Sequence, residues 1–410
     1  MARILAYTSP AIGHLFPMTP LLLELQARGH DVHLRTIGSR VDLMRSLGLP
    51  TEPVDPAILG VTHPDWEASN PKQALEVAIS TFCERGAIDG PDFEQAIADV
   101  APDTVLVDTN AWGALSVAEA WGGPWTVFSP YTPPISSAGT PPFGPGLLPK
   151  AGPLGRLRDS VVRPLVIGAA ERTMKPRINA LRASYGLAPV QSADEYFRRA
   201  PLMLVTTSEP FEYPHADWGE RIRMIGALPW DPPAERPAWL DEVDRPVVLV
   251  TTSSEYQADE ALVRAALEGL RDEPYTVVAT MPAGVQGLGD LPANARVLDF
   301  VPHGHVLDQT AVAVTHGGMG ATQKALARGI PVCVVPFGRD QLEVAARAVH
   351  AGAGTRVAAK RLTPERLRDA VREAAAKQAG AARVAAGFAA AGGAAAGADA
   401  MEGLLTPARH

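Results

Sequence analysis

Short apolar runs recur along the whole chain, and segments with a helical pattern separate them. The runs lack the alternation of apolar and polar residues that marks a half-exposed strand, which is typical of parallel strands buried on both faces. They occupy residues 3–9, 31–36, 103–108, 125–130 and 202–208 in the first half, and residues 246–252, 276–281, 296–301, 312–316 and 332–336 in the second. This order predicts an α/β fold with two doubly wound, Rossmann-like domains.

Residues 17–29 show how the helices fit between the strands. Pro17 suits the first turn of a helix, and Gly29 suits its C-terminal cap. With the strands before and after it, this helix forms a βαβ unit, whose crossover is almost always right-handed.

Prolines mark the predicted boundary between the domains. Four of them fall in residues 227–240, which show no regular period, so we assign residues 227–242 to a linker. The domains would then cover residues 1–226 and 243–385. The Ala/Gly-rich residues 386–410 either pack back on the first domain as a helix or fray.

The composition limits the kinds of partner. With 46% hydrophobic and 20% charged residues among 410, the chain is globular and long enough for two or three domains. Its formal net charge of −8 includes no basic block, which argues against binding to nucleic acid. Cys83 and Cys333 stand far apart, so we predict neither a disulfide framework nor a cysteine metal site. We predict no signal peptide and no membrane span, and we expect a cytoplasmic protein.

The turn His316-Gly317-Gly318 carries the first candidate chemistry. It follows a predicted strand and opens a helix, where backbone N–H groups and the helix dipole attract anions. Glycines at 317, 318 and 320 would let a diphosphate approach the backbone, and His316 could donate a ring N–H to it. The alternative is a tight turn beside a hydrogen-bonded core histidine.

Asp340 and Gln341 follow the next apolar run, so they should lie beside that turn. A carboxylate accepts hydrogen bonds, and an amide both donates and accepts them, which suits the vicinal hydroxyls of a sugar. Asp340 could also be the N-cap of a helix that starts at Gln341, and the two roles do not exclude each other.

His14 and Asp108 each follow or end a predicted strand in the first half, with His14 expected on a loop. An imidazole suits the removal of a proton near neutral pH, and a carboxylate on its second nitrogen would fix the tautomer. A structural histidine and a capping aspartate are the alternative.

Residues 297–354 combine the HGG turn, a glycine-containing helix start and the sequence P-x-x-x-D-Q. This segment resembles the nucleotide-sugar signature of the GT-B glycosyltransferases, which include plant and animal UDP-sugar transferases and bacterial antibiotic (macrolide-type) glycosyltransferases. The bacterial natural-product branch is the most similar. Length, duplicated α/β plan and central linker match over nearly the whole chain, and the resemblance implies two domains that face each other across a cleft.

The resemblance implies a role for each matching residue. The diphosphate of a UDP- or TDP-sugar would be held by His316 and the backbone of Gly317, Gly318, Gly320 and Ala321, with Ser253 also facing the phosphates. Asp340 and Gln341 would bind the donor sugar. Val301 would present backbone groups to the pyrimidine, and Phe300 stands where plant members have a base-stacking tryptophan.

Two positions depart from the family pattern. Lys324 stands where the family often has a glutamate that binds ribose hydroxyls, and a lysine cannot accept those hydrogen bonds. Ala321 stands where a serine or threonine is usual, so a hydroxyl contact to phosphate is lost unless Thr322 replaces it. The choice between UDP and TDP therefore stays open.

The resemblance also matches His14, in G-H-x-x-P, to the family's general base and Asp108 to its activating acid. It implies an inverting hexosyl transfer in one displacement, with no metal ion and no cofactor besides the nucleotide-sugar co-substrate. His303 and His305 form an H-x-H without a third ligand nearby in sequence, so we assign no metal site to them.

The acceptor is expected to be a small lipophilic molecule that binds mainly to the first domain. Trp66, Tyr131 and Phe143 either line its pocket or pack on the surface. Residues 130–153, rich in proline and glycine, are either a functional loop or a disordered excursion. Two other functions stay open: a nucleotide-sugar epimerase or hydrolase of the same fold, and a non-catalytic auxiliary protein that activates a partner.

Overall fold

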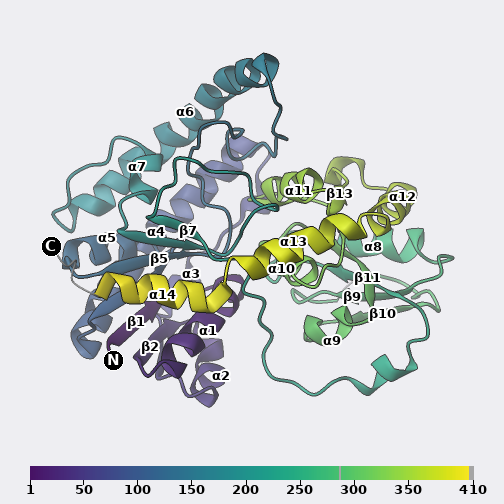
Figure 1. Cartoon of the computed structure of the whole chain (residues 1–410), viewed down its shortest axis with the longest axis horizontal. Helices are drawn as coiled ribbons and strands as arrows, with labels where there is room; N and C mark the ends of the chain where they lie inside the picture. The colour runs from purple at the N-terminus through teal and green to yellow at the C-terminus, as the bar shows by residue number, and fades with distance from the viewer. Residues whose placement is uncertain (286–287, 406–410) are drawn as a thin grey trace.

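The computed structural model describes residues 1–285 and 288–405, and each half of the chain builds a parallel β-sheet (Figure 1). The first sheet has the order β3-β2-β1-β4-β5-β6-β7, and the second has the order β10-β9-β8-β11-β12-β13. The strands of the first are β1 (Arg3–Tyr7), β2 (Asp31–Thr36), β3 (Thr51–Pro53), β4 (Thr104–Asp108), β5 (Trp125–Ser129), β6 (Leu202–Val205) and β7 (Ile222–Met224). Those of the second are β8 (Val247–Thr251), β9 (Thr276–Thr280), β10 (Ala295–Leu298), β11 (Thr310–Thr315), β12 (Val332–Val334) and β13 (Gly354–Arg356).

Helices connect the strands and cover the sheets (Figure 1). In the first half they are α1 (Ile12–Ala27), α2 (Val41–Ser46), α3 (Ala57–Gly60), α4 (Pro71–Val100), α5 (Trp112–Trp121), α6 (Pro153–Ala183) and α7 (Ala193–Phe197). In the second they are α8 (Glu260–Gly269), α9 (His303–Leu307), α10 (Met319–Leu326), α11 (Gln341–His350), α12 (Pro364–Ala375), α13 (Gln378–Ala390) and α14 (Gly393–Leu405).

Each face of both sheets carries a buried core, as the apolar runs predict, although β2 alternates buried and partly exposed residues. Along β1, Leu5 and Tyr7 point into one core, and Ile4 and Ala6 point into another on the opposite face. The second sheet likewise separates two cores. The prediction of two doubly wound α/β domains is therefore confirmed.

The ten predicted strands all form, and the structure adds β3, β7 and β13. Each of these three lies near or at a sheet edge, is three residues long and is partly exposed. An edge strand of this length has no continuous apolar run, so the hydrophobic pattern misses it.

The helix predicted at residues 17–29 begins earlier, at Ile12. The carbonyl of Ala11 accepts hydrogen bonds from the amides of His14 and Leu15 and so opens the helix. Pro17 and Pro20 lie inside the helix, whose buried face stabilises it across both prolines. The prediction of a loop at His14 is therefore wrong, because His14 belongs to the first turn of α1.

The alanine-rich end of the chain crosses from the second domain to the first as α13 and α14 (Figure 1). α14 packs on α1, and Arg28, the C-cap residue of α1, pairs with Asp399 and Glu402 at 2.6 and 3.0 Å. By length and apolar composition alone, residues 378–405 could cross a membrane, which is weak evidence because core helices pass the same test. Residues 406–410 of the predicted 386–410 segment lie outside the described residues, and the domain boundaries and the cytoplasmic location stay predictions.

Candidate active site

His14 and Asp108 form a hydrogen-bonded pair at the carboxyl ends of β1 and β4. The Nδ1 atom of His14 lies 2.7 Å from Oδ2 of Asp108, whose side chain is fully buried, while 15% of the His14 side chain is exposed. Since the carboxylate only accepts, Nδ1 carries the proton, and the lone pair is left on Nε2. That is the tautomer a general base needs.

The pKa of His14 reflects opposing influences. Burial alone would lower the pKa, but the charge and hydrogen bond of Asp108 outweigh it, and Glu255 and Asp340 add to the rise. Both belong to the second domain, so His14 faces Asp340, one of the two residues predicted to bind the sugar. The tertiary structure thus brings together the two halves of the predicted site.

His316 opens the strand-to-helix turn between β11 and α10, and its ring is buried. Its Nδ1 lies 3.3 Å from the carbonyl oxygen of Thr251 and donates to it. Burial, helped by the positive charge of Arg339, lowers the pKa of His316 to about 4, so the ring is neutral near pH 7. Nε2 then has no proton to donate, and a hydrogen bond from it to an anion requires the ring to gain one.

A side chain would have a different effect at each of Gly317, Gly318 and Gly320. Gly317 has φ +96°, and a Cβ there would lie 2.8 Å from Cβ of Gln341. At Gly318 a Cβ would collide with the His316 ring, whereas at Gly320 it would meet nothing within 4 Å. Backbone conformation and steric contacts within the protein therefore explain the glycines at 317 and 318, whereas Gly320 leaves open space at the start of α10.

Replacing Gly317 by alanine should destabilise the turn by roughly 1–3 kcal/mol, because L-residues rarely adopt its backbone conformation and the new Cβ pushes on Gln341. Urea denaturation monitored by circular dichroism measures this loss. Gly320→Ala is the matched control, since an alanine favours a helix and finds room there. Equal stability of Gly317→Ala and the wild type would contradict the steric argument.

Asp340 precedes α11 at the N-cap position but makes no side-chain capping hydrogen bond. Burial raises the pKa of Asp340, and the nearby Arg339 and His14 partly oppose that rise. Asp340 therefore holds the predicted N-cap position, but its carboxylate does not cap the helix.

Gln341 is buried and largely occupied within the protein. Its Oε1 accepts from the amides of Phe337 and Gly338 at 2.8 and 3.0 Å, and its Nε2 donates to the side chain of Gln257. One amide proton is left for a ligand. The structure thus gives Gln341 a role in holding the loop before Asp340, which the sequence did not predict.

The remaining predicted donor residues line the same end of the second sheet. Ser253 is buried, its amide donates to Asp259 at 2.8 Å, and its Oγ accepts from the amide of Glu255 at 3.2 Å, so the hydroxyl proton stays available. Val301 is buried, and the Phe300 side chain is 57% exposed. Ala321 lies in the first turn of α10.

Lys324, which replaces the expected glutamate, pairs with Asp231 of the predicted linker at 2.5 Å. The same carboxylate accepts from the amide of Gly304 at 2.9 Å. The two histidines make separate hydrogen bonds, His303 with the hydroxyl of Thr280 and His305 with the carbonyl oxygen of Ala234. Within residues 1–285 and 288–405, no group of three or more His, Cys, Asp or Glu side chains could hold a metal ion.

Arg339 is a site residue that the sequence analysis did not identify. Its guanidinium binds both carboxylate oxygens of Asp65 in the first domain, at 2.9 and 3.1 Å, and Glu255 in the second, at 3.0 Å. Its φ of +54° is unusual for a residue with a side chain. Beside it, Trp66 and Tyr256 pack edge to face across the boundary with ring centroids 5.5 Å apart. Trp66 therefore packs on the second domain.

A buried ionic network also joins the domains. Arg347 of α11 donates to Glu212 and Glu343, each at 2.7 Å, and Glu343 accepts from the amides of Gly144 and Gly146, each at 2.8 Å. The Pro/Gly-rich residues 130–153 are thus fixed on the helix that starts at Gln341. The interpretation of this segment as a disordered excursion is wrong.

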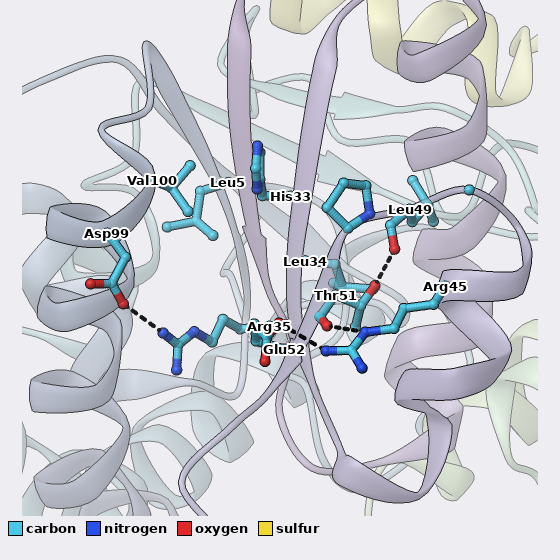
Figure 2. A pocket seen from close by; sticks show the side chains of 12 residues that line it. Leu5, His33, Leu34, Arg35, Arg45, Leu49, Thr51, Glu52, Asp99 and Val100 are labelled. Carbon is cyan, nitrogen blue, oxygen red and sulfur yellow. Dashed lines mark hydrogen bonds and ion pairs between the residues drawn. The ribbon is translucent and has the colours of Figure 1, made fainter.

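A separate cavity of about 420 Å³ lies between β2, β3 and the end of α4 (Figure 2). Its charged side chains are already paired, Arg35 with Asp99 at 3.1 Å and Arg45 with Glu52 at 2.8 Å. No predicted site residue lines it. The chemistry described above lies elsewhere, where the two domains meet.

Comparisons with known proteins identify the family and the fold. Residues 265–399 match the family described as "Erythromycin biosynthesis protein CIII-like, C-terminal domain". The 4'-demethylrebeccamycin synthase of Lentzea aerocolonigenes is 34% identical over 90% of this chain and 91% of its own length. The calicheamicin glycosyltransferase CalG4 superposes with a TM-score of 0.76 over 100% of both chains at 22% identity. The glycosyltransferase VinC, solved in complex with dTDP, has a TM-score of 0.71 over 98% of this chain and 99% of its own at 23% identity. At these identities the two structures establish the fold.

Proposed function

Because the chain belongs to the macrolide-type glycosyltransferases of bacterial natural-product biosynthesis, we propose that it moves a sugar from a UDP- or TDP-sugar to a hydroxyl of a small lipophilic acceptor. The transfer proceeds with inversion at the anomeric carbon. The observation that carries this proposal is the His14–Asp108 pair, which faces Asp340 of the other domain.

In the proposed reaction, Nε2 of His14 takes the proton of the acceptor hydroxyl as its oxygen attacks the anomeric carbon. The bond from that carbon to the diphosphate breaks, and the diphosphate leaves with the electron pair. Asp108 stabilises the imidazolium that forms, as the acid of a triad does. Attack and departure occur on opposite faces of the carbon, so an α-linked donor gives a β-glycoside.

The donor would lie along the second domain. Its diphosphate would occupy the N-terminus of α10, where the open space at Gly320 and the helix dipole favour an anion. The sugar would contact Asp340 and the remaining amide proton of Gln341. His316 would donate to the diphosphate once the anion raises the pKa of its ring. Ser253 would offer its hydroxyl proton, and Val301 would present backbone groups to the pyrimidine.

A screen of UDP-glucose and TDP-sugars against phenolic, polyketide and macrolide acceptors tests the proposal. Mass spectrometry should detect a glycoside in at least one combination, NMR should show the inverted anomeric configuration, and excess chelator should leave the rate unchanged. Release of nucleotide without an acceptor would instead indicate a hydrolase or epimerase. Failure of every pair by a folded protein would favour the auxiliary role.

A further inference from the structure

Asn110, a residue outside the His14–Asp108 pair, lies against the proton-accepting nitrogen of His14. Its Nδ2 is 3.3 Å from His14 Nε2, and its Oδ1 accepts from the hydroxyl of Tyr131 at 2.7 Å. Its backbone amide also donates to Oδ1 of Asp108 at 2.8 Å. Asn110 therefore connects both ends of the imidazole, one through its side chain and one through the carboxylate.

The negative charges around His14 favour its protonated form. The titratable and charged groups that face the ring are Asp108 of β4, Glu255 beside α8, Asp340 before α11 and the phenol of Tyr131 after β5. The three carboxylates favour the imidazolium, and an imidazolium cannot accept a proton. A base in this position needs a partner that favours its neutral form.

The amide of Asn110 is such a partner. An amide N–H can bond to Nε2 only while that nitrogen keeps its lone pair, because a protonated Nε2 would meet the amide hydrogen head on. The hydroxyl of Tyr131 donates to the amide oxygen, and in this orientation the amide nitrogen lies toward His14. Burial raises the pKa of Tyr131, so the phenol stays protonated and remains a donor.

We propose that Asn110, oriented by Tyr131, is a positioning residue that keeps the Nδ1 proton of His14 on Asp108 and its Nε2 lone pair free for the acceptor. The incoming hydroxyl replaces the amide, since its O–H donates to the same lone pair. This inference rests on the proposed function for its purpose, but its physical content concerns only His14 and its neighbours.

The test is an NMR titration of the His14 imidazole in the full chain. Asn110→Ala and Tyr131→Phe should each raise the pKa of His14 by roughly one pH unit, because a hydrogen bond to the neutral ring is lost. Asn110→Asp should raise it further, because a carboxylate replaces an amide of the same shape. Tyr256→Phe, a phenol of the other domain that packs on Trp66, is the matched control and should leave the titration unchanged.

The same variants should move the acidic limb of kcat/KM to higher pH by a similar amount, with less effect on the rate at alkaline pH. A merely structural role would change the rate equally at every pH. An unchanged or lowered His14 pKa in both Asn110→Ala and Tyr131→Phe would overturn the inference. Should Asn110→Ala not fold, Tyr131→Phe, which removes one oxygen, gives the same test. If no transfer is found, the titration still decides, so the two proposals fail independently.

Discussion

Replacing His14 by alanine should lower kcat by about two to four orders of magnitude, the usual contribution of a general base. The hydroxyl would then attack without a proton acceptor, while the donor groups of the second domain remain in place. Affinity for the nucleotide diphosphate, measured by calorimetry, should therefore stay close to the wild-type value. Near-normal turnover in this variant would remove the mechanism.

Asp108→Asn tests the same pair with little change in shape. The new amide can present its N–H to Nδ1 and so select the wrong tautomer of His14, which should also lower kcat.

The pH profile of kcat/KM tests the protonation of His14. The folded protein raises the pKa of His14 above the ordinary histidine value of about 6.5. The ring should therefore gain its second proton, and kcat/KM should fall, at a higher pH than for an ordinary histidine.

Replacing Arg347 by methionine should destabilise the protein by roughly 3–5 kcal/mol, the usual cost of breaking a buried ion pair. The side chains of Arg347, Glu212 and Glu343 are at most 5% exposed, so the variant leaves two carboxylates buried without their cation. Unfolding in urea, monitored by circular dichroism, measures the change. Arg372→Met is the control, because the Arg372 side chain is 57% exposed and its pair with Glu273 should contribute little.

Acid should act on the same network. Burial by itself would raise the pKa of Glu212, but Arg347, with help from His215 and Thr132, lowers it to about 2. The unfolded pKa is near ~4.3. Because the folded value is the lower one, the stabilisation is present above pH ~4.5 and is lost as the pH falls toward 2. Arg347→Met should lose less stability over this range, and an equal loss in both proteins would show that the network does not cause it.

Several features were fixed by local sequence. The apolar runs identify ten of the thirteen described strands, because a strand buried on both faces is apolar along most of its length. The turn at His316 and the pair Asp340-Gln341 are recognisable because a helix N-terminus and a strand end demand particular residues. Where the local signal is weak, the prediction was wrong: the edge strand β3 was missed, and the start of α1 was placed too late.

Other features depend on residues far apart in the chain. Arg339 binds Asp65, 274 positions earlier, and Arg347 binds Glu212, 135 positions earlier, so no local pattern reveals either pair. Arg339 directly precedes the recognised Asp340-Gln341 pair, and Arg347 lies further along the chain, in α11. Sequence alone suggested the neighbourhood but not the partners.

The sequence by itself determined the α/β plan, the family signature and the residue types of the site, because periodicity and turn chemistry are local properties. Only the tertiary structure decided that His14 faces Asp340, that Tyr131 and Asn110 complete the surroundings of His14, and that Lys324 pairs with Asp231. Those facts arise from the packing of two domains against each other. Such packing sets burial, charge and hydrogen-bond partners at once, and it therefore decides which of the recognised residues can act together.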